Sequence, residues 1–233
     1  MPDDLANRLY AAFPDTDSMR LQKSLKEDKF TAYQMDKYDP LLGEAVYAFQ
    51  EKKVIDLVSE ITEIENLLAD DSLYLGGVSL MVKGQFLNPH VDNSHNESFT
   101  RYRRLNLLYY VSPKWKLDNG GNFELWDEGL SHPPRTIESR FNRMVVMATS
   151  RHSLHSVSPI VKDVRRCCIS NYYFSTNSID SKTYYHGTYF RGRPGQPVRD
   201  LILRANVVLK RIIRMVNTTG YSDRTHLNRS GKN

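Results

Sequence analysis

The first third of the chain carries apolar residues at helical spacing. Residues 3–13 (DDLANRLYAAF) predict a short amphipathic helix with acidic side chains at its start. After the Asp39-Pro40 break, residues 41–50 and 52–70 predict two further helices, because their apolar residues recur every three or four positions. The stripe of the later helix consists of Val54, Leu57, Val58, Ile61, Ile64, Leu67 and Leu68. A stripe of this kind typically packs on a sheet.

The pattern changes near Ser72 to short segments rich in β-branched and aromatic residues. These segments are LYLGGVSLMV, RLNLLYYV, NFELWD, RMVVMA and CCISNYYFS. Turn formers separate them, for example Lys83-Gly84 and the run from Asp118 to Gly121. Successive short strands without intervening helices indicate an antiparallel sandwich or barrel.

A final helix is predicted beyond the break at residues 194–197. Residues 198–216 (VRDLILRANVVLKRIIRMV) are amphipathic, and we expect arginines and lysine on the outer side. Their apolar stripe could dock on the chain's own barrel or on another subunit, and the pattern does not determine the oligomeric state. The last dozen residues are polar, which is typical of a frayed end.

The chain is therefore expected to form one domain over residues 1–233, mainly β with flanking helices. Its parts would be a helical N-terminal layer (1–71), a β core (72–176) and a C-terminal extension with a helix (177–233). No apolar run reaches the roughly 18–20 residues that span a bilayer. The N-terminus is acidic and lacks the basic and apolar regions of a signal peptide.

The charge distribution bears on the possible binding partners, and the cysteine content bears on the cellular compartment. From Ser175 onward there are 11 Lys/Arg against 3 Asp/Glu, which leaves 21 against 24 before it, within a net charge of +5. The basic segment is either a solvated helix face or a surface for nucleic acid or another anionic partner. The lack of aromatics among its basic residues argues against nucleic acid. Because Cys167 and Cys168 are adjacent, we expect both to be small buried side chains that form no disulfide with each other. This cysteine content predicts that the protein is cytoplasmic.

The tract GQFLNPHVDNS holds the chemistry that stands out. His90 and Asp92 are two apart, and residues i and i+2 of a strand point to the same face. His155, from a later segment, supplies a third ligand, with His152 as the local alternative. Two histidines and one carboxylate on one face of an octahedron are typical of non-haem Fe(II) oxygenases.

A buried arginine near such a centre can anchor a dicarboxylate cosubstrate. Arg166 begins the segment RCCISNYYFS, and alternation places Arg166, Cys168, Ser170 and Tyr172 on one face. A guanidinium with a hydroxyl four residues on can clasp one carboxylate. A register error of one residue would put Arg165 there instead.

Together these pieces resemble the prolyl 4-hydroxylase-like branch of the Fe(II)/2-oxoglutarate-dependent dioxygenases. The matching segments lie between about residues 78 and 175, in the family's order: GQFLNPHVDN, RRLNLLYYVSPKW, NGGNFELWD, NRMVVMATSRHSLHSV and RRCCISNYYFS. The resemblance implies a double-stranded β-helix (jelly roll) fold. It implies Fe(II), 2-oxoglutarate and O2 as cofactor and cosubstrates, with ascorbate as a further candidate. It also implies a hydroxylase that produces succinate and CO2.

The resemblance also assigns residues. It implies His90, Asp92 and His155 as iron ligands, and Arg166, Tyr110, Ser170 and Asn106 as residues that bind the cosubstrate. In the family pattern the third ligand follows an apolar residue and precedes a small one, which favours His155 over His152. Met81 departs from the family, since many members have a tyrosine there that can bond the cosubstrate.

The sequence does not decide whether the substrate is a small molecule or a peptidyl side chain such as proline. Arg103, in the run from Arg101 to Arg104, matches a family arginine and is a substrate candidate together with Tyr172. That basic run could equally be a solvated strand edge. His95 lies in a polar loop, where we expect it to be exposed. A zinc hydrolase or other metal-binding protein on a cupin-like barrel is the competing class, because the same ligands can hold zinc.

Overall fold

The structure of this chain, a computed structural model, describes all residues except 71–72, 74–75, 179–183 and 217–233, and its last described side chain is residue 209. Its helices are α1 (Asp3–Ala12), η1 (Thr16–Ser18), η2 (Met35–Lys37), α2 (Pro40–Ala48), α3 (Lys52–Thr62), η3 (Leu117–Asn119) and α4 (Pro197–Val216). Its strands are β1 (Arg20–Lys23), β2 (Glu27–Ala32), β3 (Gly77–Met81), β4 (Phe86–Val91), β5 (Tyr102–Tyr110), β6 (Phe123–Leu125), β7 (Arg135–Ile137), β8 (Arg143–Ala148), β9 (His155–Val157), β10 (Arg166–Ser175) and β11 (Tyr189–Phe190).

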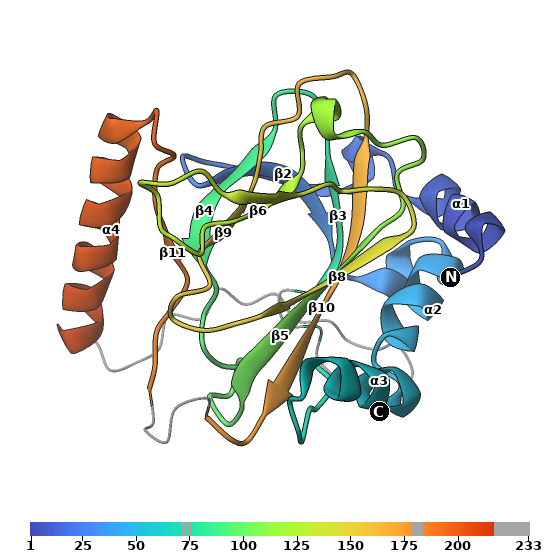
Figure 1. Cartoon of the computed structure of the whole chain (residues 1–233), viewed down its shortest axis with the longest axis horizontal. Helices are drawn as coiled ribbons and strands as arrows, with labels where there is room; N and C mark the ends of the chain where they lie inside the picture. The colour runs from blue at the N-terminus through green and yellow to red at the C-terminus, as the bar shows by residue number, and fades with distance from the viewer. Residues whose placement is uncertain (71–72, 74–75, 179–183, 217–233) are drawn as a thin grey trace.

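The strands curl into a jelly-roll core, as Figure 1 shows. Their order is β7-β6-β9-β4-β2-β3-β10-β5-β8, with β1 added on β2 and β11 on β4. Every pairing is antiparallel. The fold class expected from the short successive strands and from the family resemblance is thus confirmed. The curl leaves one face of β3, β5 and β10 inside the core and the other face outside it.

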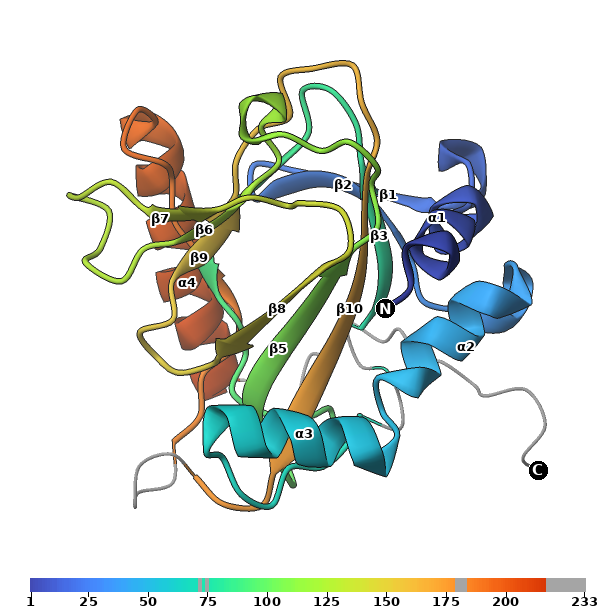
Figure 2. The same cartoon turned by 45° about the vertical axis from the view of Figure 1, so that its right-hand side comes forward.

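The N-terminal helices cover that outer face (Figures 1 and 2). Alternate residues of β10, namely Cys167, Ile169 and Tyr173, lie in one apolar core with Leu42 and Val46 of α2. Each fully buried aliphatic or aromatic side chain contributes roughly 1.5–3 kcal/mol to stability, so this layer holds α2 on the sheet. The inner face of the sheet is left for polar side chains.

The helix predicted over residues 52–70 is shorter in the structure than the sequence pattern indicates. α3 ends at Thr62, and Glu63 takes a left-handed backbone conformation with φ of 55°. Farther on, Leu68 exchanges two backbone hydrogen bonds with Phe174 of β10. This long-range pairing draws the segment onto the sheet edge, which a local apolar stripe cannot reveal. The stripe itself is divided, since Val58 is buried while Ile61 is 65% exposed.

Two strands also lie where the sequence predicted only helices. β2 joins the two halves of the core, because it pairs with both β3 and β4. Its residues are only partly buried, apart from Ala32. A strand with that burial leaves no clear alternation of apolar and polar residues in the sequence.

The C-terminal helix forms as predicted, and the exposed residues of its described part include Arg204 but also several large apolar side chains. Leu203 is buried against the core, and Arg191 holds the start of α4 through a two-pronged ion pair with Asp200 at 2.7 and 3.1 Å. The outward face, expected to be basic, carries Leu201 and Leu209, which are 68% and 54% exposed. Among the described residues, α4 included, no helix has the length and apolar character needed to cross a membrane.

We expect the turn that precedes β6 to tolerate only glycine at position 120. The φ of Gly120 is +71°, and a Cβ there would lie 2.0 Å from the carbonyl oxygen of Pro159. Gly120→Ala should lower the free energy of unfolding by about 2–4 kcal/mol, from backbone strain and overpacking together. Urea denaturation measures this loss. Gly84→Ala is the matched control, because Gly84 has φ +87° but no atom within 4 Å, so it should lose only about 1 kcal/mol. Equal losses would contradict the steric argument.

Candidate metal centre

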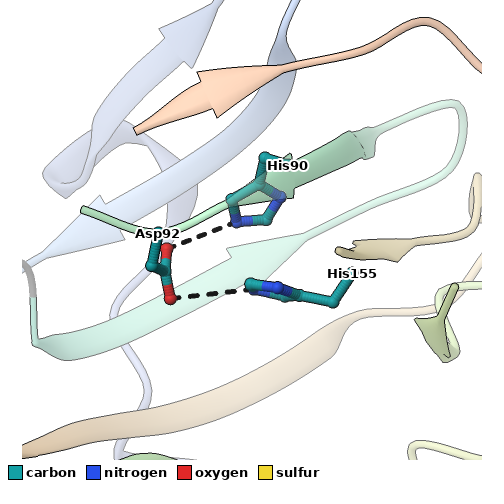
Figure 3. A group of neighbouring side chains, drawn as sticks. All are labelled: His90, Asp92 and His155. Carbon is teal, nitrogen blue, oxygen red and sulfur yellow. Dashed lines mark ion pairs between the residues drawn. The ribbon is translucent and has the colours of Figure 1, made fainter. Parts of the chain in front are cut away.

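Three buried side chains meet at a junction of β4 and β9 (Figure 3). His90 on β4 pairs directly with His155 on β9, and Asp92 follows one residue after β4 ends. The Nε2 atom of His90 lies 3.6 Å from Asp92 Oδ1, and that of His155 lies 3.8 Å from Asp92 Oδ2. One ligand atom from each residue falls within 4.8 Å of the others, a spacing that could hold a metal ion.

Backbone carbonyl groups orient both imidazole rings. His90 Nδ1 lies 3.0 Å from the carbonyl oxygen of Asn88, and His155 Nδ1 lies 2.9 Å from that of Ser153. Each Nδ1 can donate its proton to the carbonyl beside it, which turns each Nε2 toward Asp92. Burial and the neighbouring His155 lower the pKa of His90 to about 3, which keeps its ring neutral at physiological pH.

The Asp92 carboxylate fits a bound cation. Burial opposes its ionisation, but the electrostatic interactions with the His155 ring and the Arg103 guanidinium outweigh burial and lower the pKa of Asp92. Its Oδ2 atom is buried, and no described group hydrogen-bonds it. A buried carboxylate oxygen without a hydrogen bond is costly unless cations lie near it, and a bound metal would add to the Arg103 guanidinium 3.6 Å away. Two imidazole nitrogens and one carboxylate therefore form a ligand set that would suit Fe(II).

The other histidines near this centre lie outside the triad. His152 is exposed in the turn before β9, and its ring does not belong to the cluster of possible ligands. The expectation that His95 is exposed was wrong. Only 7% of His95 is accessible, because its ring packs 4.4 Å from that of Tyr102 and its Nδ1 meets the Ser94 hydroxyl at 2.8 Å. The polar loop folds back over its own histidine, a tertiary contact that composition does not show.

Arg166 and Tyr110 face each other inside the core. Tyr110 opposes Cys168 in the β5–β10 register, which brings its ring 4.9 Å from the Arg166 guanidinium. Burial raises the pKa of Tyr110, although Arg166 lies close enough to oppose that rise. The hydroxyl is buried and makes no hydrogen bond of normal geometry to a described residue. Arg165 lies on the other face, where its guanidinium donates to the carbonyl of Pro14.

The hydroxyl that contacts Arg166 belongs to Ser139, which sequence reasoning missed. Arg166 Nε donates to Ser139 Oγ at 3.2 Å, and Ser139 is fully buried. Ser170, expected beside Arg166, instead directs its hydroxyl to the Gly77 carbonyl at 3.5 Å. Ser139 sits in the loop before β8, and no local pattern marks it. The Met81 sulfur lies 3.8 Å from Arg166 Nη1 and so lines the same pocket.

A β-bulge directs Arg103 toward the metal ligands. Plain alternation along β5 would put Arg103 on the outer face with Leu105, but the β5–β10 register shifts between Tyr173 and Phe174. Arg103 is 1% exposed, and its Nη1 lies 3.6 Å from Asp92 Oδ2. No described group hydrogen-bonds any of its three guanidinium nitrogens. Bulges often re-aim a side chain beside an active site.

One of the expected pocket residues lies against that guanidinium, and another lies opposite the first in the neighbouring strand. The Tyr172 ring stacks on Arg103 at 3.9 Å. Asn106 opposes Tyr172 across the β5–β10 pair, and its buried Oδ1 has no hydrogen-bond partner among the described residues. Both cysteines are buried and free, as predicted, and burial raises the pKa of Cys167 to about 12. The inner face of the core is thus polar and incompletely paired around the triad.

Comparison with known protein families gives one match to this part of the chain. The model of the 2OG-Fe(II) oxygenase superfamily matches residues 76–174, which include the triad, Arg103, Tyr110 and Arg166. Comparison with curated protein sequences gave no match.

Comparison with solved structures supports the same fold. A prolyl-4-hydroxylase from Pseudomonas putida is 14% identical, with a TM-score of 0.56 over 75% of this chain and 88% of that one. The viral collagen prolyl hydroxylase of Paramecium bursaria Chlorella virus-1, bound to 2OG, is 13% identical, with a TM-score of 0.50 over 75% and 92%. HygX from Streptomyces hygroscopicus, with nickel, 2-oxoglutarate and hygromycin B bound, is 10% identical, with a TM-score of 0.50 over 76% and 80%.

Proposed function

We propose that the chain is a 2OG-Fe(II) oxygenase of the prolyl 4-hydroxylase-like kind, because residues 76–174 match that superfamily and the fold is similar to that of a prolyl-4-hydroxylase. It would hydroxylate an unactivated C–H bond of a small molecule or of a peptidyl side chain, with proline as one candidate. Its cofactor is Fe(II) and its cosubstrates are 2-oxoglutarate and O2. When bound together, these supply the oxidising power for hydroxylation and release succinate and CO2. The observation that carries the proposal is a buried His-Asp-His triad on the same inner face as a buried arginine–tyrosine pair.

In the proposed mechanism the triad holds the metal without changing protonation. The Nδ1 protons of His90 and His155 stay on backbone carbonyls, so both Nε2 atoms are ready to bind. The ionised Asp92 contributes the negative charge, and its burial keeps water from competing.

The Arg166–Tyr110 pair anchors the cosubstrate. Arg166 would bind the distal carboxylate of 2-oxoglutarate through parallel hydrogen bonds, and the unsatisfied Tyr110 hydroxyl would donate one more. Ser139 holds the guanidinium through its Nε atom, which leaves the Nη groups for the carboxylate. Asn106 and Ser170 complete the cosubstrate-facing residues of this proposal.

This pair also argues against the competing class, a zinc hydrolase or other non-oxygenase metal protein. A hydrolase needs a metal-bound water but no buried cation beside the metal for a second carboxylate. Keeping Arg166 dehydrated with Met81 and Tyr110 as neighbours costs free energy, which a bound dianion would return.

Arg103 is our candidate for substrate recognition, with Tyr172 as its support. A wholly buried guanidinium with no described hydrogen-bond acceptor, 3.6 Å from a metal ligand, suits a carbonyl or carboxylate group of the substrate. The Tyr172 ring fixes the guanidinium plane by stacking. Among the similar structures, HygX has the small molecule hygromycin B bound, whereas two others are prolyl hydroxylases. Both substrate types therefore belong in the test.

The test is succinate formation by the purified, Fe(II)-loaded protein. The protein should bind 2-oxoglutarate and release succinate slowly without substrate. Release should accelerate with one class of a panel of free amino acids, proline-containing peptides, sugars and aminoglycosides. Mass spectrometry of the accelerating compound should show one added oxygen atom. No succinate with any compound, together with no affinity for 2-oxoglutarate, would contradict the proposal.

Arg103→Lys is expected to impair substrate use but not cosubstrate binding. Lysine keeps a positive charge near Asp92 but loses the planar fork, so substrate-stimulated succinate formation should fall roughly ten- to hundredfold. Substrate-free succinate formation and the 2-oxoglutarate Kd should stay within about twofold of wild type. Arg104→Lys is the matched control, because Arg104 is directed away and donates to the Asn177 carbonyl. A loss of 2-oxoglutarate affinity in Arg103→Lys would move Arg103 into the cosubstrate site.

A further inference from the structure

The outward face of α4 carries an apolar stripe. Fifteen large hydrophobic side chains are exposed among the described residues, and five of them lie within twelve residues of this helix. They are Val198, Leu201, Ile202, Val208 and Leu209, which are 48–70% exposed. Their three- and four-residue spacing places them along one side of the helix. An exposed apolar patch of this kind marks an interaction surface.

Within the part of the chain that the structure describes, this stripe is uncovered. α4 is the outermost helix on its side of the core, as Figure 1 shows. Leu203 and the Arg191–Asp200 ion pair fix the opposite side of the helix to the core, so the stripe cannot turn inward.

Charge distinguishes between the partners that an apolar stripe could take. The α4 segment contains five basic residues, Arg199, Arg204, Lys210, Arg211 and Arg214, against one acidic residue. That residue, Asp200, is engaged by Arg191. Arg204 is exposed, one helical turn beyond Asp200. Two copies of α4 packed stripe to stripe would bring like charges together, whereas an anionic surface would neutralise them.

We propose that α4 is an interfacial helix that docks the enzyme on an anionic lipid surface. A large apolar face beside basic residues, with low average hydrophobicity, is the composition of helices that lie in the plane of a membrane without crossing it. The apolar stripe would enter the headgroup region, and the basic side chains would pair with lipid phosphates or carboxylates. This inference does not depend on the reaction at the metal centre.

Vesicle co-sedimentation of the full chain tests the proposal. The protein should bind phosphatidylcholine vesicles that contain phosphatidylserine, and binding should weaken as salt rises, because screening shortens from about 30 Å at 0.01 M to about 3 Å at 1 M. Leu201→Gln with Leu209→Gln should weaken binding at least about tenfold. Arg204→Gln should weaken it roughly fivefold. Leu57→Gln with Ile61→Gln is the matched control, because these side chains are equally exposed on α3 and should leave binding unchanged.

Each remaining outcome would overturn the assignment. Absence of binding to anionic vesicles, or equal binding to pure phosphatidylcholine, would remove the anionic lipid surface as partner. A dimer in light scattering that the α4 double variant dissociates, without vesicle binding, would make a second copy of the chain the occupant. If the double variant fails to fold, Arg204→Gln and the salt dependence of the wild type decide in the same way.

Discussion

Alanine in place of His155 is expected to abolish tight metal binding and succinate formation, whereas alanine in place of His152 leaves both intact. His155 is 4% exposed, and its Nε2 lies 3.8 Å from Asp92 Oδ2. Losing a partner outside the coordination sphere typically costs 10–100-fold in metal affinity, so losing a ligand itself should cost more than about a hundredfold. Calorimetric titration with Fe(II) under anaerobic conditions, and metal content after dialysis, measure the effect.

The His152 variant controls for a change in the same segment. His152 is exposed in the turn and contributes no ligand atom to the cluster, so its replacement should change metal affinity by less than about twofold. Thermal melting in the presence of chelator shows whether either variant loses its fold. Retention of tight metal binding by His155→Ala, with loss in His152→Ala, would exchange the two residues in the proposed triad.

Arg166→Ala is expected to abolish 2-oxoglutarate binding and leave metal content unchanged. A charge-assisted hydrogen bond contributes about 1.5–3 kcal/mol to binding. Losing two of them should therefore lower the affinity for 2-oxoglutarate at least about a hundredfold, which corresponds to about 3 kcal/mol. The metal ligands come from β4, β9 and the residue after β4, and Arg166 hydrogen-bonds none of them, so the metal site should keep its geometry. Equilibrium binding of 2-oxoglutarate to the metal-loaded protein measures the loss.

Arg165→Ala is the control that the chain itself offers. Arg165 precedes Arg166, but its side chain lies on the outer face and contacts Pro14 and Tyr10. Its replacement should leave 2-oxoglutarate affinity within about twofold. The 2-oxoglutarate affinity of Arg166→Lys should lie between those of Arg165→Ala and Arg166→Ala, because lysine keeps the positive charge but lacks the planar guanidinium. Unchanged affinity in Arg166→Ala would refute the carboxylate clasp and return the zinc hydrolase as the better candidate.

Local spacing made the candidate metal site predictable from the sequence. His90 and Asp92 stand two apart in an extended segment, so one backbone conformation aims both toward a common point. Alternation along β10 similarly separated Arg166 from Arg165. The order of short strands predicted the antiparallel core, because each strand carries its own composition and turn signals.

Residues that act through distant neighbours could not be predicted in this way. Ser139 meets Arg166 across 27 positions in the sequence, and nothing around it indicates that contact. Arg103 faces the metal ligands only because the register shifts at Tyr173 and Phe174 of the partner strand. His95 is buried by rings from elsewhere in the chain.

The sequence by itself determined which segments are strands or helices over most of the chain, and which three side chains could share a metal. Only the tertiary structure decided where α3 ends, how β2 joins the two halves of the core, and that the apolar stripe of α4 faces outward. The physical reason is the range of the forces. Periodicity reports backbone conformation within a few residues, whereas burial and register depend on contacts between segments that are distant in the sequence.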